Sequence, residues 1–477
     1  MEVEGPPEIV ASRSCRNGKK LVAFIIEQNM RLNHSYAPIV TFWSNVKDNY
    51  HALWLYELLN TLYSSQCLNT PNLQMYQLKQ LNIMIAYSTP GSKQLTEAYL
   101  KRARIAYARE EDFYCLYNIS HAEEVSTTHF TSDDSIQAMY YRARVRRNGS
   151  IDPTPHNGRT FENCLSEVDC KDSVNYGRHL VGRQTFGSGN TVLSEVPFVS
   201  LLVHNFWLRC HHCLIYAPLV LIPCQYCSLA QFCSDTCRNR AYEEYHSMEC
   251  AIMPILLAQC TPIQFLALRL TIRVYKMFLG TSDALDAYIR TLSEDIRANE
   301  YSTPSPKPDY RKIYRLATNR KHLSRKTLTS DGLRAVSLAR MLVREHGLPT
   351  SFVELLAELT VRHLHILRSN ALVLHCSVDE PSKDEYSSSS VPYALVLVTT
   401  GSMFSHSCDA NVDYSLSPDG AIMFVANRYI PRGTQMHINY RIDPTDTRYA
   451  FECYCEKCTT KRILDQPSTL TEVPERL

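Results

Sequence analysis

Apolar residues recur at helical spacing through the first third of the chain. Leu55, Leu59 and Leu62 share one helix face, which predicts a helix that begins near Tyr50. The same spacing predicts three further helices, over residues 72–87, 92–109 and 110–123. The segment Ser88-Thr89-Pro90-Gly91 separates the first two of these, because proline and glycine interrupt helices. We therefore expect a helical region over residues 1–147.

Small residues within this region suggest how its helices cross. Ala98, Ala103 and Ala106 fall in the pattern over residues 92–109. Paired antiparallel helices with small residues at their crossings are typical of helical repeat arrays. The repeat is irregular, so two interpretations stay open: a tetratricopeptide-like array and a plain helical bundle.

Turn-forming residues predict a linker over residues 148–173. Asn148-Gly149-Ser150 and Asp152-Pro153-Thr154-Pro155 contain the residue types that interrupt helices and strands. Four arginines precede them, namely Arg142, Arg144, Arg146 and Arg147. A cluster of like charges is most simply a solvated face, and that is our expectation for these arginines.

Extended and helical patterns alternate in the rest of the chain. Residues 180–203 predict strands around a turn at 187–190, and residues 391–440 predict further strands after a flexible break at 387–390. Helical patterns between these strand regions cover residues 252–279, 309–345 and 352–367. Turns are expected at 417–420 and 431–433. Together, the predicted helices and strands indicate a multi-domain protein of the α+β class.

The charge balance excludes several kinds of partner. The chain of 477 residues carries 50 basic and 48 acidic side chains, which argues against strong sequence-independent binding to nucleic acid or anionic membranes.

No run of about 18 apolar residues occurs, so no membrane span is expected. The segment Met1–Val10 contains Glu2 and Glu4 and does not resemble a secretion signal. In a reducing intracellular compartment, 18 cysteines are better explained by metal than by disulfides.

Eight metal-ligand residues lie between positions 210 and 250. They are Cys210, Cys213, Cys224, Cys227, Cys233, Cys237, His246 and Cys250, with the intervals CxxC, CxxC, CxxxC and HxxxC. Zinc in structural sites takes four thiolate or imidazole ligands, so eight ligands predict two ions in one small module. The alternatives are disulfide staples or scattered core thiols, but His246 fits no disulfide scheme.

A second cysteine group stands near residue 455. Cys453, Cys455 and Cys458 form CxCxxC, which supplies three thiolates and is one ligand short of a closed zinc site. The fourth ligand must come from elsewhere in the fold. Cys408 is a candidate, but the residues alone leave this choice open because other cysteines are unallocated.

The two cysteine groups, in this order and with these flanks, resemble the SET and MYND domain family of protein lysine methyltransferases over residues 174–460. The resemblance implies that Cys210, Cys213, Cys233 and Cys237 share one zinc, and that Cys224, Cys227, His246 and Cys250 share another. It also implies that Cys408 completes a third site with Cys453, Cys455 and Cys458. The implied divisions are a first SET half at 174–209, a MYND module at 210–250, a helical insert at 251–377, a second SET half at 378–443, a zinc loop at 444–460 and a tail at 461–477.

The resemblance further implies S-adenosyl-L-methionine as the cofactor. The implied contacts are Arg178, His179, Asn370, Ser405, His406, Tyr440 and Phe451, and Tyr440 matches the active-site tyrosine. A lysine amine has a pKa near 10.4 in water, so it must lose a proton and be aimed at the methyl group. An apolar channel lowers that pKa, and a tyrosine hydroxyl can orient the neutral amine.

Three departures from the family pattern cluster at the expected cofactor site. Ser405 replaces an asparagine, His179 replaces a glycine, and Asp409-Ala410 replaces a residue followed by proline. An asparagine amide offers two donors and an acceptor, whereas a serine hydroxyl is shorter and offers one donor. Losing one buried hydrogen bond costs about 1–3 kcal/mol, so we expect weakened cofactor binding.

Two functions from different classes follow. The first is a lysine methyltransferase, acting on a histone or another protein, with MYND as an interaction module. The second is a scaffold with a silent SET fold, whose MYND module recruits proline-rich segments of histone deacetylase or corepressor complexes. Both would place the protein in the nucleus and cytoplasm and link it to transcription. Direct nucleic-acid binding is disfavoured, because Arg209, Arg238 and Arg240 are too few.

Overall fold

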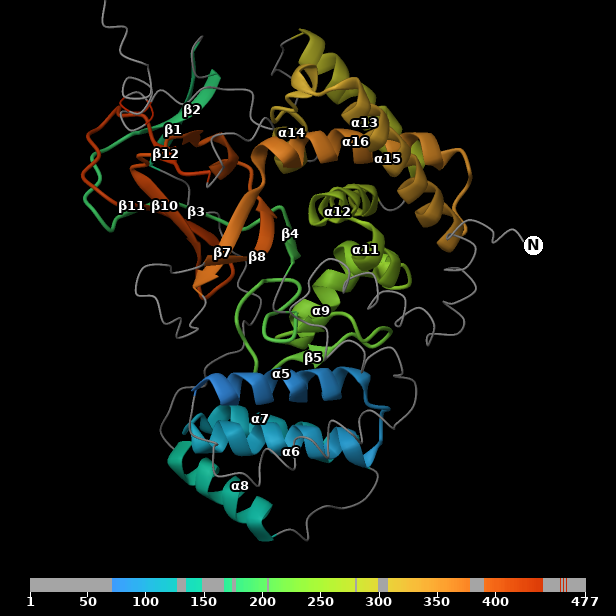
Figure 1. The fold of residues 1–477 in the computed structure, drawn as a ribbon, viewed down its shortest axis with the longest axis vertical. Coiled ribbons are helices and arrows are strands. Elements are labelled where there is room, and N and C mark those ends of the chain that lie inside the picture. Colours follow the sequence, from blue (N-terminus) through green and yellow to red (C-terminus); the bar gives the residue numbers. More distant parts are fainter. Residues whose placement is uncertain are drawn as a thin grey trace, which may run out of the picture.

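A computed structural model describes most of the chain from residue 71 onward. The described residues are 71–126, 134–147, 167–173, 177–203, 206–278, 281–298, 308–377, 390–440, 455, 458 and 460. The helix expected around Leu55 and the residues Phe451 and Cys453 lie outside these ranges. Within them, Figure 1 shows a bundle of helices below, a central irregular segment, strands at the upper left and a second group of helices at the upper right.

The N-terminal bundle contains four described helices. They are α5 (Pro71–Tyr87), α6 (Lys93–Ala108), α7 (Asp112–Val125) and α8 (Asp134–Arg147). The first three confirm the predicted helices, and Ser92 caps α6 by accepting a hydrogen bond from the Leu95 amide at 3.2 Å. The arginine run lies on α8 with most of its side chains exposed, as expected, and Arg146 pairs with Asp112 at 2.6 Å.

The helical bundle packs on residues 207–221 and forms buried hydrogen bonds to main-chain carbonyls of that segment. Asn82 donates to Trp207 O at 2.7 Å and Pro218 O at 2.9 Å, and Arg102 donates to Leu221 O at 2.8 Å. The Arg102 guanidinium is fully buried, and no carboxylate pairs with it in the described part of the chain. Main-chain carbonyls of residues 207–221 are its acceptors, and the side chains of Trp207 and Leu219 pack against the bundle as well.

Strands that are far apart in sequence share the same sheets. The strands are β1 (Val168–Ser173), β2 (Gly177–Gly182), β3 (Thr191–Glu195), β4 (Val199–Leu202), β7 (Leu372–Ser377), β8 (Ser390–Leu397), β9 (Ser405–His406), β10 (Val412–Leu416), β11 (Ile422–Ala426) and β12 (His437–Ile438). One sheet has the order β10-β11-β3 and another β4-β8-β7, while β9 pairs with β12 in parallel. The β unit is therefore split in sequence, and green strands lie among orange ones in Figure 1.

Two of these strands correct the expected division of the chain. β1 falls within the linker expected over residues 148–173, and it pairs with β2 along its whole length. β7 falls within the insert expected to be helical over 251–377, and it pairs with β8. Both strands are short, and β1 is mostly polar and exposed, so neither carries a strong alternating pattern.

The inserted part lies between β4 and β7 and is mainly helical. After β5 (Ile222–Pro223) and β6 (Gln231–Phe232) come α9 (Asp235–Ala241), a π-helix η2 (Tyr242–His246), α10 (Ser247–Glu249), α11 (Met253–Gln259), α12 (Pro262–Met277), α13 (Ser282–Ala298), α14 (Pro308–Tyr314), α15 (Arg325–Glu345) and α16 (Phe352–Asn370). The helical stretch expected over 309–345 is broken at Asn319, which has a left-handed φ of 45°. None of the helices in the described ranges has the length and apolar character needed to cross a membrane.

Candidate functional site and metal clusters

The eight ligand residues between 210 and 250 form two separate groups of four. One group is Cys210, Cys213, Cys233 and Cys237, and the other is Cys224, Cys227, His246 and Cys250; in each, the ligand atoms lie within 4.8 Å of one another. The Sγ atom of Cys233 is 3.6 Å from that of Cys213. Ligands about 2.3 Å from a tetrahedral zinc ion stand about 3.8 Å apart, so this geometry fits zinc. The partition is the one that the family resemblance implies.

Local structure presents these ligands. Ser234 caps α9 and accepts a hydrogen bond from the Cys237 amide at 3.2 Å, which fixes the start of the helix that carries this ligand. The π-helix η2 ends at His246, whose Nε2 lies 3.5 Å from Cys227 Sγ. The amide of Tyr226 donates to Cys224 Sγ at 3.4 Å, and such contacts favour a thiolate.

A third group joins residues that are 50 positions apart. Cys408, Cys455 and Cys458 bring their sulfur atoms within 4.8 Å of one another, and Cys408 Sγ lies 3.4 Å from Cys458 Sγ. Cys453, the remaining cysteine of CxCxxC, lies outside the described residues. Three soft ligands in one place fit a zinc site, and their burial is only partial.

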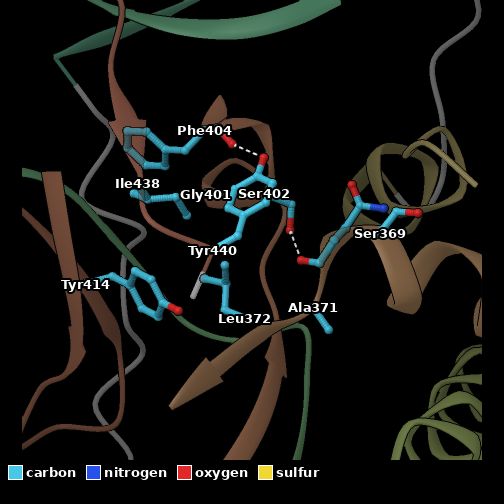
Figure 2. Close-up of a pocket in the computed structure, with 10 residues that line it drawn as sticks. Ser369, Ala371, Leu372, Gly401, Ser402, Phe404, Tyr414, Ile438 and Tyr440 are labelled. Carbon is cyan, nitrogen blue, oxygen red and sulfur yellow. Dashed lines mark hydrogen bonds between the residues drawn. The ribbon is translucent and has the colours of Figure 1, made fainter. Parts of the chain in front are cut away.

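A pocket lies beside this third group, at the junction of α16, β7, β10 and β12 (Figure 2). Its lining residues are Ser369, Asn370, Ala371, Leu372, Gly401, Ser402, Phe404, Tyr414, Ile438 and Tyr440. The Tyr440 hydroxyl donates to the Phe404 carbonyl at 2.6 Å, and the Ser402 hydroxyl donates to the Asn370 carbonyl at 3.3 Å. The pocket thus combines apolar walls with a tyrosine hydroxyl and main-chain carbonyls, which can orient an amine.

A buried carboxylate shapes one wall of the pocket. Glu195, at the end of β3, accepts hydrogen bonds at 2.9 Å from the amides of Thr399, Thr400 and Gly401. A Cβ atom on Gly401 would collide with the ring of Phe424, so only glycine fits there. Glu195 was not predicted as a site residue, because nothing in its sequence context reveals acceptors for amides some 200 residues away.

His406 connects the pocket tyrosine to the third cysteine group. Its Nδ1 accepts a hydrogen bond from the Tyr440 amide at 3.2 Å, so a neutral ring carries its proton on Nε2. That Nε2 lies 3.3 Å from Cys408 Sγ. Burial, together with the nearby His437, lowers the pKa of His406 and favours this neutral form.

Three other predicted contacts hold neighbouring backbone. Arg178 donates to Arg315 O at 2.6 Å, and Asn370 donates to Ala317 O at 2.8 Å, so both fix the segment after α14. His179 is buried and its Nδ1 lies 2.9 Å from Gly177 O. Asn370 lines the pocket, whereas Arg178 and His179 do not.

Ser405 has a partner that the sequence did not suggest. Gln435 donates from Nε2 to Ser405 Oγ at 3.0 Å. The two residues meet because β9 and β12 run in parallel, with Ser405 opposite His437. Gln435 lies two positions before His437, next to the start of β12, and bridges Val181 of β2.

Comparisons with known proteins agree with the resemblance seen in the sequence. A model of the SET domain matches residues 220–441. The protein-lysine N-methyltransferase SMYD4 of Mus musculus is 25% identical over 363 residues, which cover 60% of this chain and 45% of the mouse protein. A SET and MYND domain-containing protein of Dictyostelium discoideum is 23% identical over 330 residues, covering 62% of this chain and 60% of that protein. The chain is similar to SET and MYND domain proteins, and its residues 220–441 match the SET domain.

The match covers only part of these relatives, since the chain spans less than two thirds of their length. Among solved structures, the SET domain of LSMT bound to lysine and AdoHcy matches with a TM-score of 0.28 at 13% identity, covering 67% of this chain and 58% of that one. The pocket with Tyr440 lies within the residues that the SET model matches, and the two four-ligand groups fit the MYND module that the sequence resemblance implies.

Proposed function

We propose that this SET and MYND protein is a protein lysine methyltransferase that uses S-adenosyl-L-methionine. The observation that carries the proposal is the Tyr440 hydroxyl, which lies in the pocket and bonds to the Phe404 carbonyl at 2.6 Å. Figure 2 shows it facing the turn that carries Ser402. The Thr400 and Gly401 amides next to it donate to Glu195, so the groups around the tyrosine are preorganised.

Residues that line the pocket, together with Ser405 and His406 outside its lining, would hold and orient the reactants. When bound, S-adenosyl-L-methionine supplies a methyl group already activated on a sulfonium. Ser405, His406 and Asn370 are the residues expected to hold the cofactor. Apolar walls formed by Leu372 and Ile438 disfavour the ammonium form of a lysine and thereby lower its pKa. The Tyr440 hydroxyl, which donates its proton to the Phe404 carbonyl, would accept a hydrogen bond from the neutral amine and aim the amine at the methyl group.

The metal clusters would act through folding rather than chemistry. Their donor sets are thiolates and one imidazole, and sets of four such ligands leave no open position for a substrate. Binding of zinc to such sites contributes folding free energy. The third cluster would hold Cys408 beside His406, whose Nδ1 accepts from the Tyr440 amide, and would so hold the tyrosine in place.

A second candidate function rests on an exposed aromatic pair beside the second cluster. Tyr226 is 69% exposed and stacks on Tyr242 with ring centroids 5.1 Å apart. Exposed stacked aromatic rings suit proline-rich segments in an extended conformation. We propose that the MYND module recruits such segments, as found in corepressor or histone deacetylase complexes, in the nucleus and cytoplasm. This role is compatible with catalysis and would survive its loss.

Methyl transfer from radiolabelled S-adenosyl-L-methionine into lysate proteins tests the proposal. Wild-type protein should label lysines. Tyr440→Phe should lower the rate of lysine labelling by about 100-fold or more, because it loses the positioning hydroxyl. Tyr429→Phe is the matched control, since Tyr429 is 67% exposed on the same domain and should keep full activity. Equal labelling by wild type and Tyr440→Phe would contradict the role of Tyr440, and the absence of lysine labelling by wild type would contradict the proposed methyltransferase activity.

A further inference from the structure

We propose that Gln435 supplies the amide that the cofactor site lacks at Ser405, so that the two side chains together bind the amino-acid end of S-adenosyl-L-methionine. This inference deepens the proposed function and rests on it. It changes the expectation of weak cofactor binding, which came from Ser405 considered alone. The residue that compensates lies 30 positions later in the chain, two residues before β12, the strand that pairs with β9.

The geometry places the two side chains as one unit. Gln435 Nε2 donates to Ser405 Oγ at 3.0 Å, and both residues are half-buried. Asn411 fixes the backbone beside them, because its Nδ2 donates to Gln435 O at 3.0 Å and its Oδ1 accepts from the His437 amide at 2.8 Å. The chain continues through β12 to Tyr440 in the pocket, three residues after His437.

The hydrogen-bonding capacity of the pair equals that of the missing side chain. An asparagine amide offers two N–H donors and one carbonyl acceptor. In the pair, one Gln435 N–H is used by Ser405 Oγ. The second N–H of Gln435 and the Ser405 O–H remain as two donors, and Gln435 Oε1 remains as the acceptor. Among the described residues, Gln435 Oε1 has no hydrogen-bond partner.

This set of groups fits the amino-acid end of the cofactor. The acceptor Oε1 suits an ammonium group, and the two donors suit a carboxylate. No charged side chain of this chain is required at Ser405 or Gln435 for that recognition. A half-buried position strengthens such hydrogen bonds relative to bulk water.

Calorimetric titration with S-adenosylhomocysteine, which keeps the amino-acid end, tests the pair without depending on methyl transfer. Gln435→Leu should bind about 5- to 150-fold more weakly than wild type, which corresponds to losing one hydrogen-bonded group. Adding Ser405→Asn to Gln435→Leu should restore the affinity to within about threefold of wild type, because the amide then stands at position 405. Gln184→Leu is the matched control, since Gln184 is exposed on the loop after β2.

The outcomes separate this inference from the proposed function. If wild type binds and Gln435→Leu binds equally well, the inference is overturned and the proposed function stands. The same holds if Ser405→Asn fails to restore binding in a variant whose melting temperature matches that of wild type. If wild type gives a flat titration at millimolar S-adenosylhomocysteine, both the inference and the proposed function are overturned.

Discussion

The MYND module and the SET pocket are built in opposite ways. All ligands of the MYND clusters come from residues 210–250, and each cluster is assembled from pairs three or four positions apart. The pocket takes its walls from α16, η4 (Gly401–Met403), β10 and β12, and Glu195 on β3 holds it from about 200 residues earlier. Metal coordination lets a short segment fold locally, whereas the pocket requires the whole split sheet to be in place.

The largest effect is expected when one cysteine ligand is removed from each region in turn. Cys233→Ser should unfold the MYND module and release helices α5 to α8, because the carbonyls that accept from Asn82 and Arg102 lie in that module. Cys408→Ser should leave those helices protected. Hydrogen exchange of amides in α5 and α6, measured by mass spectrometry, distinguishes the two variants. Cys260→Ser, which alters a thiol outside the clusters, is the control.

Equal protection of α5 and α6 in Cys233→Ser and wild type would contradict the dependence of the helical bundle on the metal module. Equal loss of protection in Cys233→Ser and Cys408→Ser would contradict the separation of the two regions.

The next prediction concerns the contact between the bundle and the module. Arg102→Ala should lower the free energy of unfolding by about 3 kcal/mol or more, because it leaves Leu221 O and the side-chain oxygens of Asn82 and Asn118 without their donor in a buried place. Urea unfolding measures the loss. Arg144→Ala, on the exposed face of α8, should change stability by less than about 0.5 kcal/mol. A matching small effect for Arg102→Ala would show that the interface does not depend on this cation.

The smallest effect concerns the helices that support the pocket. His363 on α16 is fully buried, with Tyr310 Oη at 2.9 Å and Thr271 Oγ1 at 2.8 Å, and burial lowers its pKa to about 3. An unfolded histidine has a pKa of about 6.5, so below pH 6.5 the unfolded chain binds a proton that the folded chain does not. Stability should therefore fall as the pH drops from 6.5 towards 3, by about 2 kcal/mol between pH 7 and pH 5 for this group.

Urea unfolding of wild type and His363→Gln at pH 7 and pH 5 measures that contribution. The variant should lose about 2 kcal/mol less than wild type over this interval, because glutamine does not titrate. His322→Gln, at an exposed position, should behave like wild type. An identical pH dependence for wild type and His363→Gln would rule out His363 as the group responsible.

Features built within one short segment could be predicted from the sequence, whereas features built from distant segments could not. The cysteine spacing shows eight ligands for two ions, and helices over 72–87, 92–109 and 352–367 follow from apolar periodicity. The roles of Glu195 and Gln435 could not be predicted, because their partners depend on sheet pairing between distant segments. Pairing of short strands such as β9 and β12 leaves almost no pattern in two residues.

Ser405 also shows that the sequence does not reveal which distant residue will contact a site. From the sequence alone, the loss of an asparagine amide at position 405 predicts weak cofactor binding. The structure places the Gln435 amide on that serine. A substitution at one position of a site therefore has to be judged with the strands that fold beside it.

Zinc content measured by native mass spectrometry tests the central claim, that three metal clusters organise the MYND module and the pocket beside Tyr440. Wild-type protein should carry three zinc ions, and Cys408→Ser should carry two while keeping the MYND pair. Fewer than three ions in wild type, with cluster thiols that react freely with a thiol reagent, would contradict the account.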